Sequence, residues 1–247
     1  MLVCVPVRLA QQMQTFHNLN SMPPRTIAVE GPAASGKSTI GRLLAARLGY
    51  TFLDSGILYR FIAQNVLLQG VSPDDEARVT DLANKLDLAL PIAKATDGNG
   101  GHAMIDLQGL RAPEIDQLVP IVARYPGVRE TVRGLQRAAA SRGRIVIAGR
   151  DIGTVVLPDA DLKVFLSVSV EERARRRYAE QRRSGEQATM ASTLEDLRKR
   201  DALDKDREIS PMKRADDAIV VDADLATPDE IVKSIIEKLT PVAGTLT

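Results

Sequence analysis

Short apolar runs recur along the chain and predict the strands of a buried sheet. Each run is rich in Val, Ile and Leu, and lacks the strict alternation of apolar and polar residues that a half-exposed strand shows. Strands that are covered on both faces read as nearly continuous apolar segments. The predicted strands occupy residues 26–30, 50–53, 144–148, 162–166 and 218–221.

Segments with helical spacing separate these runs. Between residues 38 and 48, for example, Ile40, Leu43, Leu44 and Leu48 fall on one helical face, and Gly49 provides a stop. Because short apolar strands alternate with helices, the pattern predicts an α/β fold with a parallel sheet flanked by helices. The other predicted helices span residues 57–69, 72–85, 113–124, 126–142, 170–183, 193–209 and 228–239.

Two stretches interrupt the alternation. Residues 86–91 and 103–107 are short candidate strands on either side of a turn-forming cluster at 97–101, so we expect a small antiparallel insertion there. Residues 1–24 differ from the rest, and we expect them to form a disordered extension. The remaining chain, residues 25–243, is predicted to be a single domain.

Composition narrows the classes of protein that this chain can be. Hydrophobic residues make up 44% of its 247 residues, charged residues 26%, and the formal net charge is +1. These values are typical of a globular protein and give no global basic field for nucleic acid. No run approaches the roughly 18 apolar residues that cross a membrane. A single cysteine, Cys4, fits a reducing cytoplasm.

Residues 31–38 match the phosphate-binding pattern G-x-x-x-x-G-K-[ST] in full. Gly31 and Gly36 permit backbone conformations that point amide groups inward, and the loop leads into a helix N-terminus, which favours anions. Lys37 can reach the outer phosphates, and the Ser38 hydroxyl can bind Mg²⁺. The pattern predicts binding of ATP by the following segment: Gly31, Pro32, Ala33, Ala34, Ser35, Gly36, Lys37, Ser38 and Thr39.

Polar clusters follow two other predicted strands, at the sheet edge where open α/β folds bind ligands. Ser55 follows the second strand, and Arg60 lies about one helical turn further on, where it can hold a phosphate. A simple helix cap is the alternative role for Ser55. After the third strand, Arg150 and Asp151 form a charged pair within residues 149–154.

Charged residues dominate the segment from 171 to 214. Arg200, Asp204 and Arg207 fall on one helical face, where either a ligand site or a solvated ladder of ion pairs fits the spacing. Phosphoryl transfer needs positioning and positive charge more than covalent chemistry. We therefore expect an Arg-rich lid that closes over ATP.

Together these segments resemble bacterial cytidylate kinase, a P-loop nucleoside monophosphate kinase family, over the span from about residue 25 to 239. Their order and spacing carry the resemblance: residues 31–39, 53–60, 111–115, 125–129, 149–154 and 200–207. The resemblance implies a core at 25–53, 143–175 and 211–243. It also implies a region that binds the nucleoside monophosphate, with its insertion, at 54–142, and a lid at 176–210.

The resemblance also implies roles for individual residues. Lys37, Arg150 and Arg207 would be catalytic, and Ser38 would bind Mg²⁺. The residues implied to bind the acceptor are Ser55, Arg60, Arg150 and Arg207 at its phosphate, Arg200 and Asp204 at its sugar, and Arg129 and Asp151 at its cytosine.

Three features depart from the family's pattern. Pro120 stands where the family often has a serine that helps to read the base, which leaves discrimination against UMP open. Glu30 replaces the more usual aspartate before the loop, and the insertion near residues 108–110 is a few residues shorter than typical.

The predicted function is transfer of the ATP γ-phosphoryl group to CMP or dCMP, with Mg²⁺ as cofactor, in pyrimidine nucleotide metabolism. We expect a cytoplasmic monomer whose partners are ATP and CMP or dCMP, without nucleic acid or membrane. One alternative keeps the fold but changes the acceptor to UMP or to a metabolite hydroxyl such as that of shikimate. Another is an RNA-binding regulatory module whose arginines at 173–183 contact the RNA backbone.

Overall fold

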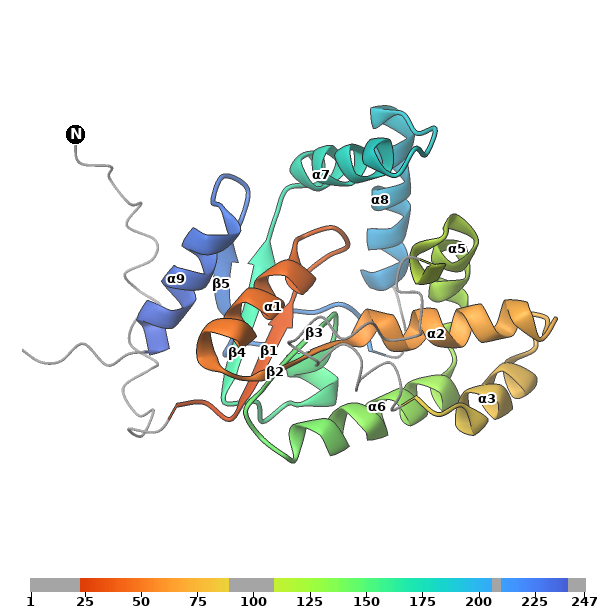
Figure 1. Cartoon of the computed structure of the whole chain (residues 1–247), viewed down its shortest axis with the longest axis horizontal. Coiled ribbons are helices and arrows are strands. Elements are labelled where there is room, and N and C mark those ends of the chain that lie inside the picture. Colours follow the sequence, from red (N-terminus) through yellow and green to blue (C-terminus); the bar gives the residue numbers. More distant parts are fainter. Residues whose placement is uncertain (1–22, 89–108, 206–209, 240–247) are drawn as a thin grey trace, which may run out of the picture.

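The computed structural model describes residues 23–88, 109–205 and 210–239, and a parallel sheet lies at its centre (Figure 1). The strand order is β2-β3-β1-β4-β5, and every neighbouring pair is parallel. The predicted α/β class is confirmed. The strands are β1 (Thr26–Glu30), β2 (Thr51–Asp54), β3 (Ile145–Gly149), β4 (Leu162–Ser167) and β5 (Ile219–Asp222).

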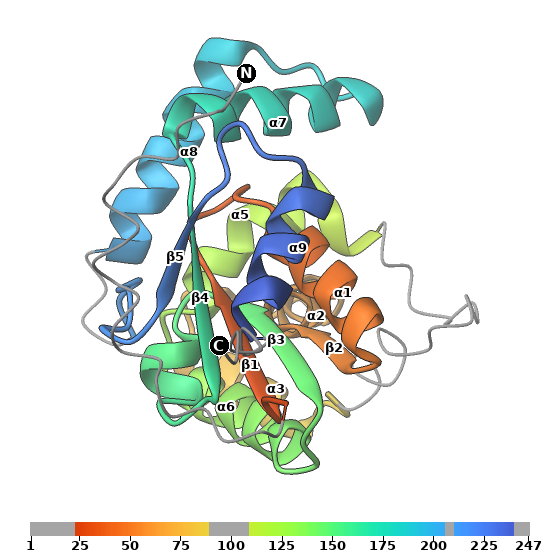
Figure 2. The same ribbon diagram turned by 90° about the vertical axis from the view of Figure 1, so that its left-hand side faces the viewer.

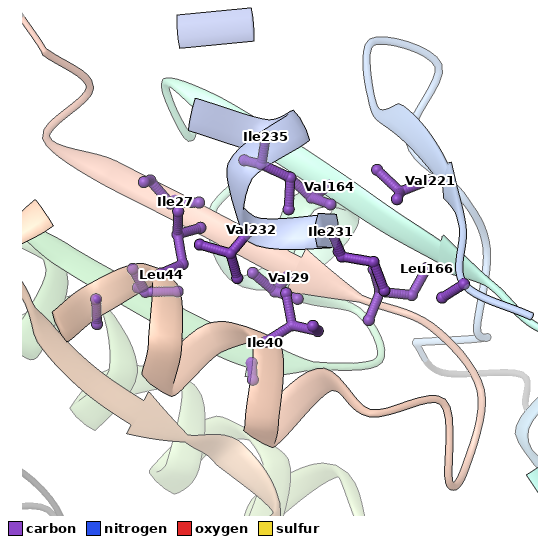
Figure 3. Close-up of a cluster of buried hydrophobic side chains, with 14 of the residues drawn as sticks. Ile27, Val29, Ile40, Leu44, Val164, Leu166, Val221, Ile231, Val232 and Ile235 are labelled. Atoms are coloured by element: carbon purple, nitrogen blue, oxygen red, sulfur yellow. The ribbon is translucent and has the colours of Figure 1, made fainter. Parts of the chain in front are cut away.

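The two faces of β1 are both covered, which explains why its sequence does not alternate. Ile27 and Val29 pack toward helices α1 (Lys37–Leu48) and α9 (Pro228–Leu239), as Figure 3 shows. Ala28 points to the opposite face, where it joins a cluster with residues of β3, the end of α6 (Pro126–Ala140) and the short π-helical segment η4 (Ile152–Val156). Central strands buried in this way hold the phosphate loop on a rigid base.

A second hydrophobic cluster lies beside the sheet, mainly among the helices α2 (Ser55–Leu68), α3 (Glu76–Lys85), α5 (Pro113–Val122) and α6, with Leu88 and Tyr125 added from the turns between them. The short 3₁₀ turn η3 (Gly109–Arg111) leads into α5. Leu58, Ile62 and Val128 are among its fully buried side chains. This helical body positions α2 and α5 along one side of the sheet's carboxyl edge.

Helices α7 (Val170–Arg183) and α8 (Met190–Lys205) lie beyond the carboxyl ends of the strands (Figures 1 and 2). A small apolar cluster of Ala33, Ala174 and Leu197 ties them to the loop after β1. The pair therefore covers the edge of the sheet from which the phosphate loop projects. In the described ranges, no helix combines the length and apolar character needed to cross a membrane.

Most predicted elements are present, with ends that shift by a few residues. Helix α3 begins at Glu76 rather than at 72, because the Asp75 side chain accepts a hydrogen bond from Arg78 N (3.1 Å) and caps it. Helix α8 begins at Met190 rather than at 193, after a turn in which Thr189 and Ser192 hydrogen-bond each other.

One local prediction is wrong and one local feature was missed. Residues 86–88 bend and turn instead of forming a strand, and Leu88 N donates to Leu86 O (2.9 Å) while the Leu88 side chain is buried. The rest of the predicted hairpin lies outside the described residues, as does the extension at 1–22. The π-helical turn at Ile152–Val156 was not predicted at all.

Candidate functional site

The loop after β1 has the backbone geometry of a phosphate-binding loop. Gly31 has φ +149°, and a Cβ there would lie 2.7 Å from the carbonyl oxygen of Leu166, so only glycine fits. Gly36 has φ +89° and forms the N-cap of α1. No side chain caps α1 and its first turn holds no acidic residue. Its free amide groups are therefore available to an anion.

Lys37 folds back onto this loop. Its ammonium donates to the carbonyl oxygen of Pro32 (2.6 Å) and lies 3.5 Å from Ser35 Oγ. The pKa of Lys37 is lowered to about 7, chiefly by burial and next by the nearby Arg150 guanidinium, while Asp54 opposes the shift. An anion beside this ammonium would stabilise its charged form, so the residue is suited to contact phosphate.

Asp54 links the loop to the second predicted cluster. One of its carboxylate oxygens accepts from Ser38 Oγ (2.5 Å), and the other accepts from Gly56 N (2.9 Å) and caps α2. The alternative in which Ser55 is the cap is therefore wrong. Ser55 is instead buried and accepts from Gln136 Nε2 (2.9 Å). Asp54 ended the predicted strand, but its sequence position alone did not reveal that it reaches Ser38.

The oxygen atoms of Ser38 and Asp54 fit a hard divalent cation. Mg²⁺ prefers oxygen ligands and keeps several waters or substrate phosphates in its shell, so two protein oxygens beside the loop suffice. Within the described residues, no group of three or more His, Cys, Asp or Glu residues is placed to hold a metal ion by itself. A cation here would depend on the nucleotide phosphates for its other ligands.

A cavity of about 300 Å³ opens beside the loop and contains most of the predicted site residues. It is bounded by α1, α2, α5, α6, α7, α8 and the segment after β3. The predicted residues that line it are Ala33, Ala34, Lys37, Ser38, Ser55, Arg60, Arg129, Arg150, Asp151 and Arg200. Pro120 on α5 also lines it, and Arg207 lies outside the described residues.

Ion pairs arrange the charged side chains of this cavity. Arg129 pairs with Asp151, and both are buried; the Arg129 guanidinium also donates to the carbonyl oxygen of Ala123 (3.0 Å). Arg150 pairs with Asp204, whose side chain is only 1% exposed. Because Asp204 faces the β3 segment, the alternative of a solvated ladder on α8 is wrong for this residue.

Two cavity residues were missed by the sequence interpretation. Asp116 on α5 contacts Arg60 (2.5 Å) and Arg177 (2.9 Å), and Arg177 of α7 lines the same cavity. No motif marks Asp116 in the sequence, and Arg177 is one of many arginines in its helix. Their roles depend on helices that are distant in the chain and come together only in the fold.

The arginines of α7 do not all belong to a free lid. Arg173 is 4% exposed, donates to the carbonyl oxygen of Ala33 (3.1 Å), and pairs with Asp201 on α8 at 2.5 Å. It therefore connects the phosphate loop to α8. Arg175 and Arg176 both pair with Glu172 on their own helix. The alternative in which arginines 173–183 contact an RNA backbone does not fit Arg173, because its side chain is buried.

A second cavity of about 560 Å³ lies on the other side of the loop. It shares Lys37 and Ser38 with the first cavity, so the two spaces meet at these residues. Residues Arg176 of α7 and Ala226 and Pro228 before and in α9 line its far side. The sequence interpretation did not identify these residues, because no short motif surrounds them.

Glu30 supports the segment that carries Arg150 and Asp151. It is fully buried at the end of β1, and its Oε1 accepts from Gly153 N (2.8 Å) in η4. The pKa of Glu30 is raised to about 7, chiefly by burial; the hydrogen bond from Gly153 N opposes the rise, and the Asp151 carboxylate adds to it. A buried acidic group at this position links β1 directly to the predicted base-reading segment.

Comparisons with known proteins agree with this geometry. A family model described as Cytidylate kinase matches residues 27–241. A cytidylate kinase of Roseiflexus castenholzii is 42% identical over 221 residues, covering 87% of this chain and 94% of the relative. One of Bacillus licheniformis is 40% identical over 212 residues, covering 85% of this chain and 94% of the relative.

A distant likeness is found among solved structures. A gluconokinase from Sinorhizobium meliloti 1021 aligns with a TM-score of 0.45 and 18% identity, covering 87% of this chain and 91% of that one. The family model and the relatives at about 40% identity span nearly the whole described fold. On that match, which confirms the resemblance seen in the sequence, the chain belongs to the cytidylate kinase family.

Proposed function

We propose that this chain transfers the γ-phosphoryl group of ATP to CMP or dCMP, giving ADP and the cytidine diphosphate. The observation that carries the proposal is the meeting of two cavities at Lys37 and Ser38, with the Arg129–Asp151 pair in one of them. A donor in one cavity and an acceptor in the other would face each other across the loop. This arrangement suits direct transfer between two bound nucleotides.

The donor would occupy the loop and the larger cavity. Amide groups of residues 31–39 would surround its phosphates, and Lys37 would contact the outer ones. The space toward Arg176, Ala226 and Pro228 would take its nucleoside. Ser38, with Asp54 behind it, would hold Mg²⁺, which supplies charge neutralisation at the donor phosphates when bound.

The acceptor would occupy the smaller cavity with its phosphate toward the loop. Ser55, Arg60, Arg150 and Arg207 would bind that phosphate, and Arg200 and Asp204 the sugar. At the base, Asp151 would accept a hydrogen bond from the exocyclic amine of cytosine, and Arg129 would hold that carboxylate in place. A carboxylate at this position favours cytosine over uracil, which carries a carbonyl there.

The chemistry requires positioning and charge stabilisation rather than a covalent enzyme intermediate. The acceptor phosphate oxygen would attack the γ-phosphorus in line while Lys37 and the arginines stabilise the charge on the transferred group. Helices α7 and α8 cover the loop and would exclude water from the transfer. We expect a cytoplasmic monomer that acts in pyrimidine nucleotide metabolism.

UMP is the second acceptor that a specific observation favours. Pro120 lines the acceptor cavity and offers no hydroxyl group for the base, so selectivity rests on the Arg129–Asp151 pair. We expect CMP and dCMP to be preferred, with measurable turnover of UMP. Membership of the family argues against the metabolite-hydroxyl and RNA-binding alternatives.

The test is an ADP-release assay on the full chain with ATP, Mg²⁺ and equal concentrations of CMP, dCMP, UMP, AMP, GMP and shikimate. The expected result is rapid ADP release with the cytidine nucleotides, slower release with UMP, and background release with the rest. A stronger response to shikimate or to a purine nucleotide would overturn the acceptor assignment. No response to any acceptor would overturn the proposed activity.

A further inference from the structure

Asp116 on α5 is surrounded by guanidinium groups from three other helices. Its Oδ1 lies 2.5 Å from Arg60 of α2 and 4.0 Å from Arg200 of α8, and its Oδ2 lies 2.9 Å from Arg177 of α7. The Asp116 side chain is 14% exposed. One carboxylate therefore joins the helical body beside the sheet to both helices that cover the loop.

This cluster lies inside the proposed acceptor cavity. Asp116 and the three arginines line the same space as Lys37. Arg60 and Arg200 are proposed above to bind the acceptor, whereas Asp116 and Arg177 have no part in that proposal. Asp116 thus places a negative charge in the cavity that the negatively charged phosphate of a substrate would also have to enter.

Two nitrogens of the Arg60 guanidinium already contact protein oxygen atoms. Its NH1 donates to the carbonyl oxygen of Leu110 (2.9 Å), and its NH2 contacts Asp116. A two-pronged contact with phosphate requires two N–H groups on one side of the guanidinium. A phosphate that approaches the NH2 of Arg60 would therefore meet the Asp116 carboxylate at the same nitrogen.

We propose that Asp116 is an internal counter-anion, which competes with the acceptor phosphate for Arg60 and its neighbours and thereby sets the affinity of the acceptor site. Without a ligand, its charge offsets part of the mutual repulsion of the three guanidinium groups. With a ligand, its charge opposes the incoming phosphate. The identity of the acceptor rests on the proposed function, but the charge argument holds for any phosphorylated acceptor.

A purely structural role for Asp116 predicts the opposite effect. If Asp116 only holds the arginines in place, loss of its charge disorders them and weakens binding of the phosphate. If it competes, loss of its charge strengthens binding, because two unit charges a few ångströms apart in a partly buried site interact by an amount worth about tenfold or more in affinity. The sign of the change in affinity therefore separates the two roles.

The experiment compares the wild-type protein with Asp116→Asn, which keeps the shape of the side chain but removes its charge. Calorimetry measures the Kd of CMP, cytidine and inorganic phosphate for each protein. We expect CMP and phosphate to bind about tenfold more tightly to the variant, and cytidine, which has no phosphate, to bind equally to both. Unchanged or weaker binding of both anions would overturn the proposal.

Two further variants test whether a change in affinity comes from the charge at position 116 itself, from the net charge of the protein or from the shape of the side chain. Asp74→Asn removes an exposed carboxylate that pairs with Arg124 at 3.2 Å, outside the cavity, and should leave every Kd unchanged. Asp116→Glu keeps the charge and extends it, so CMP should bind no more tightly than to the wild type. Tighter binding of CMP by either variant would contradict the proposal.

A second measurement needs no variant and therefore does not depend on folding of Asp116→Asn. A crystal structure of the wild-type protein with CMP should show Arg60 on the phosphate and separated from Asp116 Oδ1. The proposal would be overturned if Arg60 kept its present distance from Asp116 while other groups held the phosphate. Failure to bind CMP would instead count against the proposed function, and the phosphate measurements would still test Asp116.

Discussion

The donor and acceptor sides of this site are built in different ways. The phosphate end of the proposed donor side is one continuous segment, β1, the loop and α1, in which backbone amides and a single lysine would supply the binding groups. The acceptor side is a set of paired charges contributed by α2, α5, α6, α8 and the segment after β3. One side depends on local backbone geometry, and the other depends on contacts between distant parts of the chain.

This difference predicts how each side responds to mutation. A loop conformation is lost when a new side chain does not fit it. In a group of ion pairs, by contrast, the remaining charged side chains can form new pairs when one member is removed. The following predictions test that contrast, beginning with the largest expected effect.

Lys37→Ala should abolish most turnover while the protein remains folded. The ammonium is the only side-chain cation that the loop itself carries, and loss of such a group at a developing charge costs about 10²–10³ in kcat. Lys85→Ala, which removes an exposed lysine paired with Asp81, is the control and should have no effect. Steady-state ADP release and circular dichroism check the prediction; near-normal kcat in a folded variant would contradict it.

Gly31→Ala should destabilise the protein by about 3 kcal/mol and also weaken ATP binding. The substitution combines an unfavourable φ with contact against the Leu166 carbonyl oxygen at 2.7 Å. Gly70→Ala is the matched control, because Gly70 also has a positive φ (+60°) but nothing lies within 4 Å of a Cβ there. Denaturant unfolding should show a clearly smaller loss for the control, and equal losses would mean that the close contact is unimportant.

Asp151→Asn should reduce the preference for CMP over UMP by about tenfold, or about 1.4 kcal/mol, with little change in the KM for ATP. The amide can present either an acceptor or a donor to the base, whereas the carboxylate presents acceptors only. Measurement of kcat/KM for both acceptors checks this. A preserved CMP preference would show that groups other than the Arg129–Asp151 pair read the base.

Glu30→Gln should remove a pH dependence of stability with a modest effect on the fold. Since the pKa of Glu30 rises from 4.5 to about 7 on folding, the folded state binds more protons between these values. The stability linked to this group is fully present below pH 4.5 and is lost as pH rises through 7. Denaturant unfolding from pH 5 to 8 should therefore show a smaller decline for the variant than for the wild type.

The control for that measurement is Glu195→Gln. Glu195 is exposed, and its pKa is lowered by a hydrogen bond from Lys199 rather than raised by burial. Its variant should follow the wild-type decline between pH 5 and 8. An equal decline in Glu30→Gln and the wild type would mean that the Glu30 carboxyl does not titrate in this range.

The sequence predicted the loop after β1 well because its information is local. The pattern at residues 31–38 specifies the turn, the helix start and the lysine within one segment, and the structure places all of them as expected. The strands were predicted for the same reason, since a short apolar run is sufficient to indicate burial.

The acceptor side was predicted only in part, because its pairings cross large distances in the chain. Arg150 and Asp151 were recognised as a charged pair, yet in the fold each pairs with a residue from another helix, Asp204 and Arg129 respectively. Asp116 was missed because one aspartate in a helix has no distinguishing pattern. The sequence named Ser55 as the alternative cap of α2, whereas the cap is the adjacent Asp54; both residue types commonly serve as caps.

Arg173 has a practical consequence for exchanging parts between related kinases. Its guanidinium contacts the carbonyl oxygen of Ala33 and the carboxylate of Asp201, so the helices that cover the loop are connected to it. A chimera that takes α7 and α8 from a homologue must preserve both contacts of this arginine, the one with α8 and the one with the loop. Otherwise the graft leaves a buried cation without its counterpart, and the recipient loses stability and loop geometry together.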